Sequence, residues 1–415
     1  MNNNPKQILS SLFELKYGEK PLTAYPLPQS GSDRIYYRLK SEKYSAIGAF
    51  NSDIIENEAF FSFTNTFIET GINVPEIYAI APDKQHYLIS DLGNDTLFDI
   101  IKRNDPGKAI LCHIRDILFD LLKIQIKSSS KIDFDKCYPI KSFDKQSILW
   151  DLNYFKYDFL KLAGIPFNEM KLENDFNTLT DYLMKADSNF FMYRDFQSRN
   201  IIIKDNKAWY IDYQGGRKGP LQYDLASLLY SPKTCLNETQ REVMLEYYLS
   251  HLDGYIKVNQ DEFRELYYSF VLIRILQALG AYGFRGIHEK KLDFKKSIPE
   301  AVKNLNHLFN EGLIKPDLPE VSAIAKRLAD SSLSKKYELP NNILTIRITS
   351  FSYKNGIPDD PSENGGGFVF DCRGLPNPGR LPEYKNSYGD EKEVIDYLEQ
   401  FDEVAQFQNN VRNIT

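Results

Sequence analysis

Cysteine is scarce in this sequence, which has only 4 cysteines in 415 residues: Cys112, Cys137, Cys235 and Cys372. No two of them form a Cys-x-x-Cys pair, and no histidine stands beside them at metal-ligand spacing. The spacing therefore indicates neither a zinc site nor a disulfide framework. We expect buried thiols in a reducing compartment.

The sequence also lacks a secretion signal and an uninterrupted hydrophobic run. Residues 1–7 are polar, and the most apolar later stretch is interrupted by Arg274. The formal net charge of -6 gives no overall basic surface for nucleic acid, although it leaves a local basic patch open. These absences predict a soluble cytoplasmic protein with no membrane span.

Apolar and aromatic residues are plentiful. The hydrophobic share is 42%, the aromatic share is 13%, and there are 27 Tyr and 27 Phe. This composition is typical of a globular protein with aromatic-rich packing. Because 415 residues exceed the size at which a single core stops growing, we expect two or three domains.

Three short apolar runs in the middle of the chain predict strands: Phe190–Met192, Ile201–Ile203 and Trp209–Ile211. The turn-forming pair Asp205-Asn206 separates the last two runs. The pattern predicts a small hairpin with a loop before its first strand and another loop after its last strand.

Oxygen-bearing side chains stand on both of these loops. Asp195 and Asn200 precede the hairpin, and Asp212 follows it. Each one alone is a common turn residue. A hairpin brings its ends together, however, and Mg²⁺ is bound by one or two carboxylates plus substrate phosphate oxygens. The spacing therefore favours a phosphoryl-transfer site in which Asp195 remains free for the nucleophile.

This arrangement resembles the catalytic core of protein-kinase-like enzymes, and within them the aminoglycoside phosphotransferase and choline kinase branch. Residues 194–201 and 211–229 are similar to bacterial kinases that phosphorylate the anomeric hydroxyl of N-acetylmuramate and N-acetylglucosamine. The resemblance implies that Asp195 deprotonates the acceptor hydroxyl and that Asn200 and Asp212 hold Mg²⁺. It also implies that Asp224 braces the catalytic loop.

The amino-terminal region has a polar turn followed by two predicted strands, which end at Leu39 and Phe50. Such a turn can lay backbone N–H groups against phosphates, but it contains a single glycine, and an ordinary hairpin turn is the alternative. The stretch from Ser32 to Arg38 resembles the corresponding loop of the amino-sugar kinases. The ATP-binding residues expected here are Ser30, Gly31, Ser32, Arg34 and Arg38.

Kinase-like folds usually carry a phosphate-binding lysine on the third strand, and the strand Tyr44–Phe50 has none. We expect Arg34 or Arg38 to supply the missing charge. Glu56 and Glu58 open the next helix, where acidic side chains favour a helix N-terminus. By resemblance, the hinge whose backbone meets adenine consists of Ser90, Asp91 and Leu92.

Helical spacing is found over residues 6–17, 111–122, 150–159, 241–252, 261–282 and 299–310. The aromatic stripe of Trp150, Tyr154, Phe155 and Phe159 indicates core packing rather than a sugar platform. Arg274 lies on an otherwise apolar helix face. We favour a salt bridge from Arg274 to a carboxylate over contact with substrate.

The carboxy-terminal region has predicted strands over residues 343–351 and 368–372 and a predicted helix over residues 390–401. Residues 350–358 and 370–378 resemble the carboxy-terminal domain of the RNase adaptor RapZ, which recognises an amino-sugar phosphate and small RNA. The Gly-x-Thr-Gly-Gly-x-His-Arg-Ser loop of that family is missing. We therefore expect a partial domain, either truncated or completed by another polypeptide, and its charge does not support an RNA or protein partner.

The expected fold is α/β (α+β), a two-lobed kinase-like fold followed by a small partial α/β domain. We expect an N-lobe over residues 1–91, a C-lobe over 92–317, a linker over 318–341 and a RapZ-like domain over 342–415. The expected function is ATP- and Mg²⁺-dependent phosphorylation of a hydroxyl on a small amino sugar. The alternatives are an aminoglycoside or choline-type kinase, or a non-catalytic adaptor that senses amino sugars.

Overall fold

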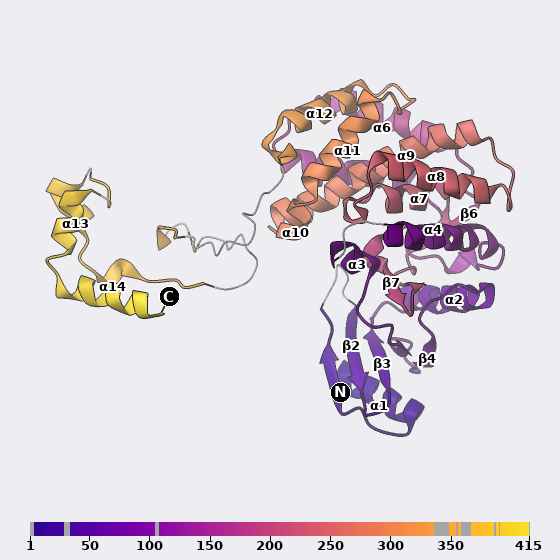
Figure 1. Cartoon of the computed structure of the whole chain (residues 1–415), viewed down its shortest axis with the longest axis horizontal. Coiled ribbons are helices and arrows are strands. Elements are labelled where there is room, and N and C mark those ends of the chain that lie inside the picture. The colour runs from indigo at the N-terminus through magenta and orange to yellow at the C-terminus, as the bar shows by residue number, and fades with distance from the viewer. Residues whose placement is uncertain are drawn as a thin grey trace. The chain divides into compact units, whose positions relative to one another are not determined.

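The computed structural model describes residues 4–28, 34–103, 108–335, 348–353, 356–357, 367–385, 387–389 and 391–414. The chain divides into two compact units, Met1–Asn342 and Ile343–Thr415 (Figure 1).

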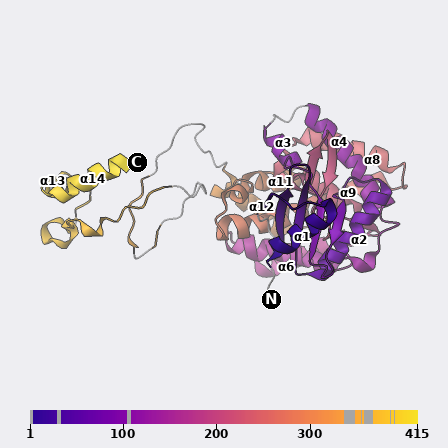
Figure 2. The ribbon, with the colours of Figure 1, turned by 90° about the horizontal axis from the view of Figure 1, so that it is seen from below.

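The first unit begins with a five-stranded antiparallel sheet in the order β1-β2-β3-β5-β4. Its strands are β1 (Thr23–Pro26), β2 (Ile35–Lys40), β3 (Ser45–Phe50), β4 (Ile77–Ile80) and β5 (His86–Ser90). The helices α1 (Pro5–Tyr17) and α2 (Ile54–Thr70) accompany this sheet, and α1 crosses it in Figure 2. The two predicted strands, now β2 and β3, are confirmed.

The alternation of side chains along β3 places one helix on each face of the sheet. Ala46 belongs to a cluster with Leu9 and Phe13 of α1, whereas Ile47 and Ala49 pack in the main core with the phenylalanines of α2. Gly48 is required for the close approach of α1, because a Cβ atom there would lie 2.8 Å from Leu39 Cδ1 and 3.0 Å from Leu9 Cδ1.

The second lobe is mainly helical. Its helices are α3 (Leu97–Arg103), α4 (Lys108–Leu122), α5 (Lys145–Phe155), α6 (Glu169–Leu183), α7 (Leu221–Leu229), α8 (Glu238–Leu252), α9 (Gln260–Tyr282), α10 (Leu292–Lys295), α11 (Ile298–Asn310) and α12 (Pro319–Asp330). Long α9 packs against α5, α7 and α11 (Figure 1). With the turn that follows it, α9 is the one described helix long and apolar enough to cross a membrane, and 67% of its apolar window is buried inside the fold.

The aromatic stripe predicted on one helix divides between core and surface. Phe155 and Phe159 are fully buried, as expected for packing residues. Trp150 is 55% exposed, so its assignment to the core was wrong. The apolar spacing identified the helix correctly, but more than half of the Trp150 side chain is exposed to solvent.

Two short antiparallel pairs carry the central loops of this lobe. β6 (Phe190–Met192) pairs with β9 (Arg217–Gly219), and β7 (Ile201–Lys204) pairs with β8 (Lys207–Tyr210). The β7–β8 hairpin confirms the prediction. Asp205 and Asn206 have φ values of 50° and 58° in its turn, and left-handed backbone at both central residues suits a two-residue hairpin loop.

The segment after α11 continues the first unit. Helix α12 packs against α6 and α11 and buries Val321, Ile324 and Leu328. The linker predicted over residues 318–341 therefore starts with a helix that belongs to the core of this unit. The amphipathic spacing of α12 explains why it folds back onto the lobe.

In the second unit the described residues form helices and short 3₁₀ turns. The helices are α13 (Lys392–Leu398) and α14 (Asp402–Ile414), and α13 confirms the helix expected there. The strand predicted over residues 368–372 is wrong, because residues 368–371 have no regular structure and Cys372–Gly374 is a 3₁₀ turn. A strand needs a hydrogen-bonded neighbour, and no described residue of this unit provides one. Of the strand predicted over residues 343–351, positions 343–347 lie outside the described residues and 348–351 form no strand.

Candidate active site

The structure brings the three predicted oxygen donors together. Asn200 Nδ2 donates to the backbone oxygen of Asp195 at 2.9 Å and to Asp212 Oδ2 at 3.2 Å. Asn200 is buried at the end of a 3₁₀ turn, and its backbone oxygen accepts from the N–H of Ile211 at 3.0 Å. One amide side chain therefore fixes the loop before the hairpin relative to the loop after it.

The backbone is strained where these side chains are presented. Arg194 has φ 80° and Asp212 has φ 68°, both in the left-handed region that residues with a Cβ seldom adopt. Such conformations cost roughly 1–3 kcal/mol each and persist where the surroundings impose them, often at functional sites. Arg194 directly precedes Asp195, the candidate base, and Asp212 is itself a candidate metal ligand.

Asp212 lies in an electrostatic setting that favours a bound cation. Loss of hydration and the Asp195 carboxylate raise the pKa of Asp212, and a hydrogen bond from Gln214 at 2.9 Å opposes this rise. The side chain of Asp212 nevertheless keeps access to solvent. A divalent cation would relieve the repulsion between the two carboxylates.

The donor set fits Mg²⁺ rather than a metal held entirely by protein. Among the described residues there is no group of three or more His, Cys, Asp or Glu side chains that could hold a metal ion. Asp212 and Asn200 together offer one carboxylate and one amide oxygen. Mg²⁺ commonly binds to so few protein ligands and fills its remaining positions with water and substrate phosphate.

Asp224 braces the catalytic loop through its backbone. Its side chain in α7 is fully buried and accepts from the N–H of Tyr193 at 2.7 Å and of Arg194 at 3.0 Å. Gln125 Nε2 adds a third donor at 3.4 Å. Burial raises the pKa of Asp224 to about 7, although these donors favour the carboxylate. The geometry agrees with the bracing role expected for Asp224.

Asp151 and Tyr223 also position the loop, through their contacts with Arg194, and neither residue was expected from the sequence. Arg194 forms a two-pronged ion pair with Asp151 of α5, with N–O distances of 2.6 Å and 2.8 Å. Arg194 also donates to the hydroxyl of Tyr223. Asp151 precedes Arg194 by 43 residues, and no local motif surrounds it, so the sequence carried no signal for this contact.

Arg274 has neutral partners, and the predicted salt bridge was wrong. It donates to Tyr223 Oη at 2.8 Å, Ser227 Oγ at 2.9 Å and Gln277 Oε1 at 2.9 Å. No ion pair links Arg274 to a carboxylate within the described part of the chain. Its Nε makes no hydrogen bond there either, although the side chain is buried. Helix α7 supplies the two hydroxyl groups and α9 itself supplies the amide, a feature that residue spacing does not reveal.

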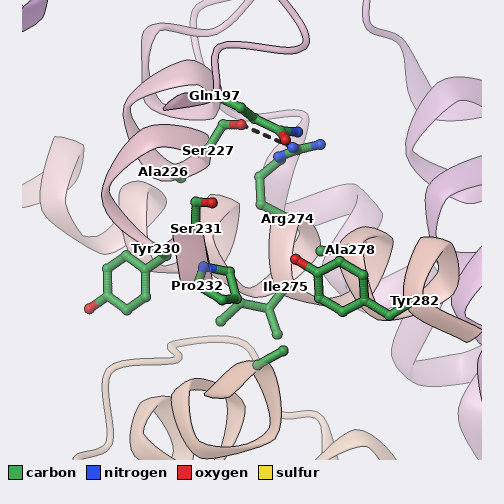
Figure 3. A pocket seen from close by; sticks show the side chains of 11 residues that line it. Gln197, Ala226, Ser227, Tyr230, Ser231, Pro232, Arg274, Ile275, Ala278 and Tyr282 are labelled. Atoms are coloured by element: carbon green, nitrogen blue, oxygen red, sulfur yellow. Dashed lines mark hydrogen bonds between the residues drawn. The ribbon is translucent and has the colours of Figure 1, made fainter. Parts of the chain in front are cut away.

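A small pocket with about 30 Å³ of internal space adjoins this arginine. Gln197 of the catalytic loop and Arg274 point to the same end of the pocket, and Tyr282 lies farther along it (Figure 3). The complete lining consists of Gln197, Ala226, Ser227, Tyr230, Ser231, Pro232, Arg274, Ile275, Ala278, Tyr282 and Ala301. Arg274 is the one charged residue in this lining, which contains no carboxylate.

Arg38, a predicted ATP-binding residue, is committed to the hinge. Its guanidinium donates to Asp91 Oδ1 at 2.9 Å, Asn94 Oδ1 at 2.7 Å and Gly93 O at 3.0 Å. A contact of 2.9 Å joins Nε to the second oxygen of Asp91. Arg38 therefore ties β2 to the segment that follows β5, and these contacts occupy its donors.

The expected hinge lies at the end of β5. Ser90 exchanges hydrogen bonds with the backbone of Glu76, Leu92 is buried, and the backbone oxygen of Asp91 accepts from Lys204 Nζ at 3.1 Å. The other expected nucleotide residues, Ser30, Gly31 and Ser32, lie outside the described residues. Arg34 is described and buried.

Comparison with known proteins bears out both resemblances. Residues 344–415 match the family model of the RapZ C-terminal domain. A nucleotide-binding protein from Clostridium acetobutylicum is 33% identical over 115 residues, which is 27% of this chain and 36% of that protein. The expected similarity of the tail to the RapZ C-terminal domain is therefore confirmed.

The kinase-like resemblance is supported by a similar sequence and by a similar solved structure. An N-acetylmuramate/N-acetylglucosamine kinase from Neisseria meningitidis serogroup B is 25% identical over 162 residues, 38% of this chain and 46% of that protein. This chain therefore spans less than half the length of either curated relative. The solved structure of a Plasmodium vivax ethanolamine kinase has a TM-score of 0.50 at 12% identity and covers 76% of this chain and 93% of its own. The expected kinase-like fold is confirmed.

Proposed function

We propose that the protein is a phosphotransferase that moves the γ-phosphoryl group of ATP, with Mg²⁺, to a hydroxyl of a small N-acetylated amino sugar, at its anomeric carbon. The observation that carries this proposal is the pair of hydrogen bonds from the Asn200 amide, one to the backbone oxygen of Asp195 and one to the carboxylate of Asp212. It supports a site in which a base, a metal and a phosphate meet at one point. The kinase-named relative points to the same class of reaction.

The roles of the residues follow from their positions. Asn200 and Asp212 would hold Mg²⁺, which neutralises charge on the phosphate oxygens. Asp195 would orient the acceptor hydroxyl and take its proton, because its carboxylate accepts no hydrogen bond from the described residues. Asp224 and Asp151 hold the backbone and side chain of the preceding arginine. Positioning and charge neutralisation supply most of the rate in such enzymes.

The lining of the pocket supports one kind of acceptor over another. Acidic surroundings favour cationic aminoglycosides and choline, whereas a neutral acetamido sugar requires hydrogen-bonding groups. This pocket offers the Gln197 amide, the Ser231 and Tyr282 hydroxyls and the Arg274 guanidinium, with no carboxylate. A neutral or negatively charged sugar is therefore favoured over a cationic acceptor.

A panel of acceptors tests this function. ATP consumption by the full chain would be measured with N-acetylglucosamine, N-acetylmuramate, kanamycin and choline, each with and without Mg²⁺. We expect turnover with an N-acetylated sugar in the presence of Mg²⁺. Turnover with kanamycin or choline alone would reject the sugar assignment, and no turnover with any acceptor would reject the kinase assignment.

A second, regulatory function is supported by the match of residues 344–415 to the RapZ C-terminal domain. In this alternative the kinase-like unit senses an amino sugar and the second unit binds RNA. Binding of a small structured RNA to the full chain, measured over a salt series, distinguishes the two functions. Affinity that falls steeply with salt would support this role, whereas the absence of binding at low salt would exclude it.

A further inference from the structure

The third strand, β3, has an alanine on the face of the sheet that packs against α2. Ala49 is fully buried, and with Ile47 it packs on the α2 side of the sheet. In the sheet register Ala49 stands opposite Tyr36 on β2 and opposite Tyr87 on β5. No lysine or arginine occurs in β3, so a cation for phosphate must come from a different element.

Arg34, directly before β2, places its charge beside the two tyrosines that flank this alanine in the sheet. Its Nη1 donates to Tyr36 Oη at 3.3 Å, and its charge also acts on the hydroxyl of Tyr87. These two tyrosines are the cross-strand neighbours of Ala49. The small side chain of Ala49 therefore leaves room on this face of the sheet for the guanidinium of Arg34.

An acidic residue of α2 holds Arg34 in place. Arg34 Nη2 lies 3.2 Å from Glu56 Oε1, and the arginine side chain is 3% exposed. Asn51 Nδ2 donates to the other oxygen of Glu56 at 2.6 Å. Glu56 stands in the first turn of α2, which Asp53 caps through the N–H groups of residues 55 and 56. A buried ion pair therefore joins the end of the candidate phosphate loop to α2.

The guanidinium retains hydrogen-bonding capacity and faces the metal-binding carboxylate. Arg34 Nε is buried without a hydrogen-bond partner among the described residues. Arg34 also interacts electrostatically with the Asp212 carboxylate, so the two groups belong to one charged cluster. Arg38, the other arginine expected to bind phosphate, is occupied by Asp91, Asn94 and Gly93.

We propose that Arg34, anchored by Glu56, replaces the missing third-strand lysine and binds the phosphate groups of the nucleotide. This inference rests on the proposed kinase function. An arginine presents planar, paired donors to phosphate, whereas a lysine presents one compact charge. The ion pair between a phosphate-binding cation and α2 is thus formed by a residue that precedes β2, in place of a lysine within β3.

Nucleotide binding to the full chain tests the proposal. The affinities for Mg²⁺-ATP and for adenosine would be measured by calorimetry for the wild type, for Arg34→Met and for Lys40→Met. Lys40 is the matched control, because it is an exposed cation at the far end of the same strand. We expect Arg34→Met to weaken ATP binding roughly 10- to 100-fold, as for loss of charge-assisted bonds, and to leave adenosine binding unchanged. Lys40→Met should match the wild type.

The outcomes separate this inference from the proposed function. A wild-type chain that does not bind ATP rejects the proposed function itself. A wild type that binds ATP and an Arg34→Met chain that binds it equally well reject only the role of Arg34. If Arg34→Met melts at a lower temperature because Glu56 is left unpaired, the double variant Arg34→Met with Glu56→Gln removes that buried charge. The double variant should still bind ATP weakly, and recovery of wild-type affinity would overturn the inference.

Moving the cation back to the third strand gives an independent test. In the double variant Arg34→Met with Ala49→Lys, the new lysine stands between Tyr36 and Tyr87, the two tyrosines with which Arg34 interacts. We expect this double variant to bind ATP at least threefold more tightly than Arg34→Met does. A folded double variant that binds ATP no more tightly than Arg34→Met would contradict the inference that cations at positions 34 and 49 serve the same phosphate groups.

Discussion

Replacing Asp224 by alanine should destabilise the first unit and disable the catalytic loop together. Asp224 is fully buried and accepts the backbone N–H groups of Tyr193 and Arg194 at 2.7 Å and 3.0 Å. Each buried donor left without an acceptor costs about 1–3 kcal/mol. We therefore expect the free energy of unfolding to fall by about 2–6 kcal/mol, a large part of the usual stability of a domain.

Tryptophan fluorescence during urea unfolding measures this loss. The chain has 2 tryptophans, Trp150 and Trp209, and both belong to the first unit, Met1–Asn342, so the signal reports that unit alone. Phosphoryl transfer should fall more than the folded fraction does, because the loop that carries Asp195 loses its brace. A loss below about 0.5 kcal/mol with normal turnover would refute the bracing role, since that is the range of ordinary surface substitutions.

The pH dependence of the same residue has a defined sign. Burial raises the pKa of Asp224 from its usual 3.8 to about 7, so the folded state holds this proton more tightly than the unfolded state. The resulting stabilisation is complete below about pH 4 and is lost as the pH rises through about 7. Because asparagine does not titrate, the stability of the wild type relative to Asp224→Asn should decrease between pH 4 and 7. A relative stability that increases over this range would contradict the assignment.

Three further substitutions test the remaining site residues. Asp195→Asn should reduce turnover about 10²- to 10⁴-fold, as for loss of a general base. The melting temperature should stay within about 2 °C, because no described residue donates a hydrogen bond to the Asp195 carboxylate. Wild-type turnover of this variant would remove the assignment of Asp195 as the base. Asp212→Asn should raise the Mg²⁺ concentration needed for half-maximal turnover at least tenfold, and an unchanged Mg²⁺ titration would exclude it as a ligand. Arg274→Gln should raise KM for the sugar and leave KM for ATP unchanged, since Arg274 lines the pocket proposed for the acceptor. An effect on ATP alone would place the acceptor elsewhere.

The sequence predicted the parts of the site that follow one another in the chain. The spacing of Asp195, Asn200 and Asp212 around a turn-forming Asp205-Asn206 implied a hairpin that brings them together, and the structure has this geometry. Such local patterns are informative because backbone preferences and strand pairing act over a few residues.

Contacts between distant segments could not be predicted in this way. Asp151 meets Arg194 across 43 positions, and the partners of Arg274 come from α7 as well as from its own helix. The sequence left Arg34 and Arg38 as equal candidates for the phosphate-binding cation. Only their partners distinguish them, because both are buried. Arg38 is bound to Asp91 at the hinge, whereas Arg34 pairs with Glu56 of α2 and its Nε has no hydrogen-bond partner among the described residues.

The most direct test of the central claim follows the γ-phosphoryl group itself. The full chain would be incubated with ATP, Mg²⁺ and N-acetylglucosamine or N-acetylmuramate, and the products would be identified by phosphorus NMR. We predict a sugar phosphate that forms with Mg²⁺ and is lost on chelation of the metal. Recovery of both sugars unmodified, under conditions in which the protein binds ATP and is folded, would contradict the account.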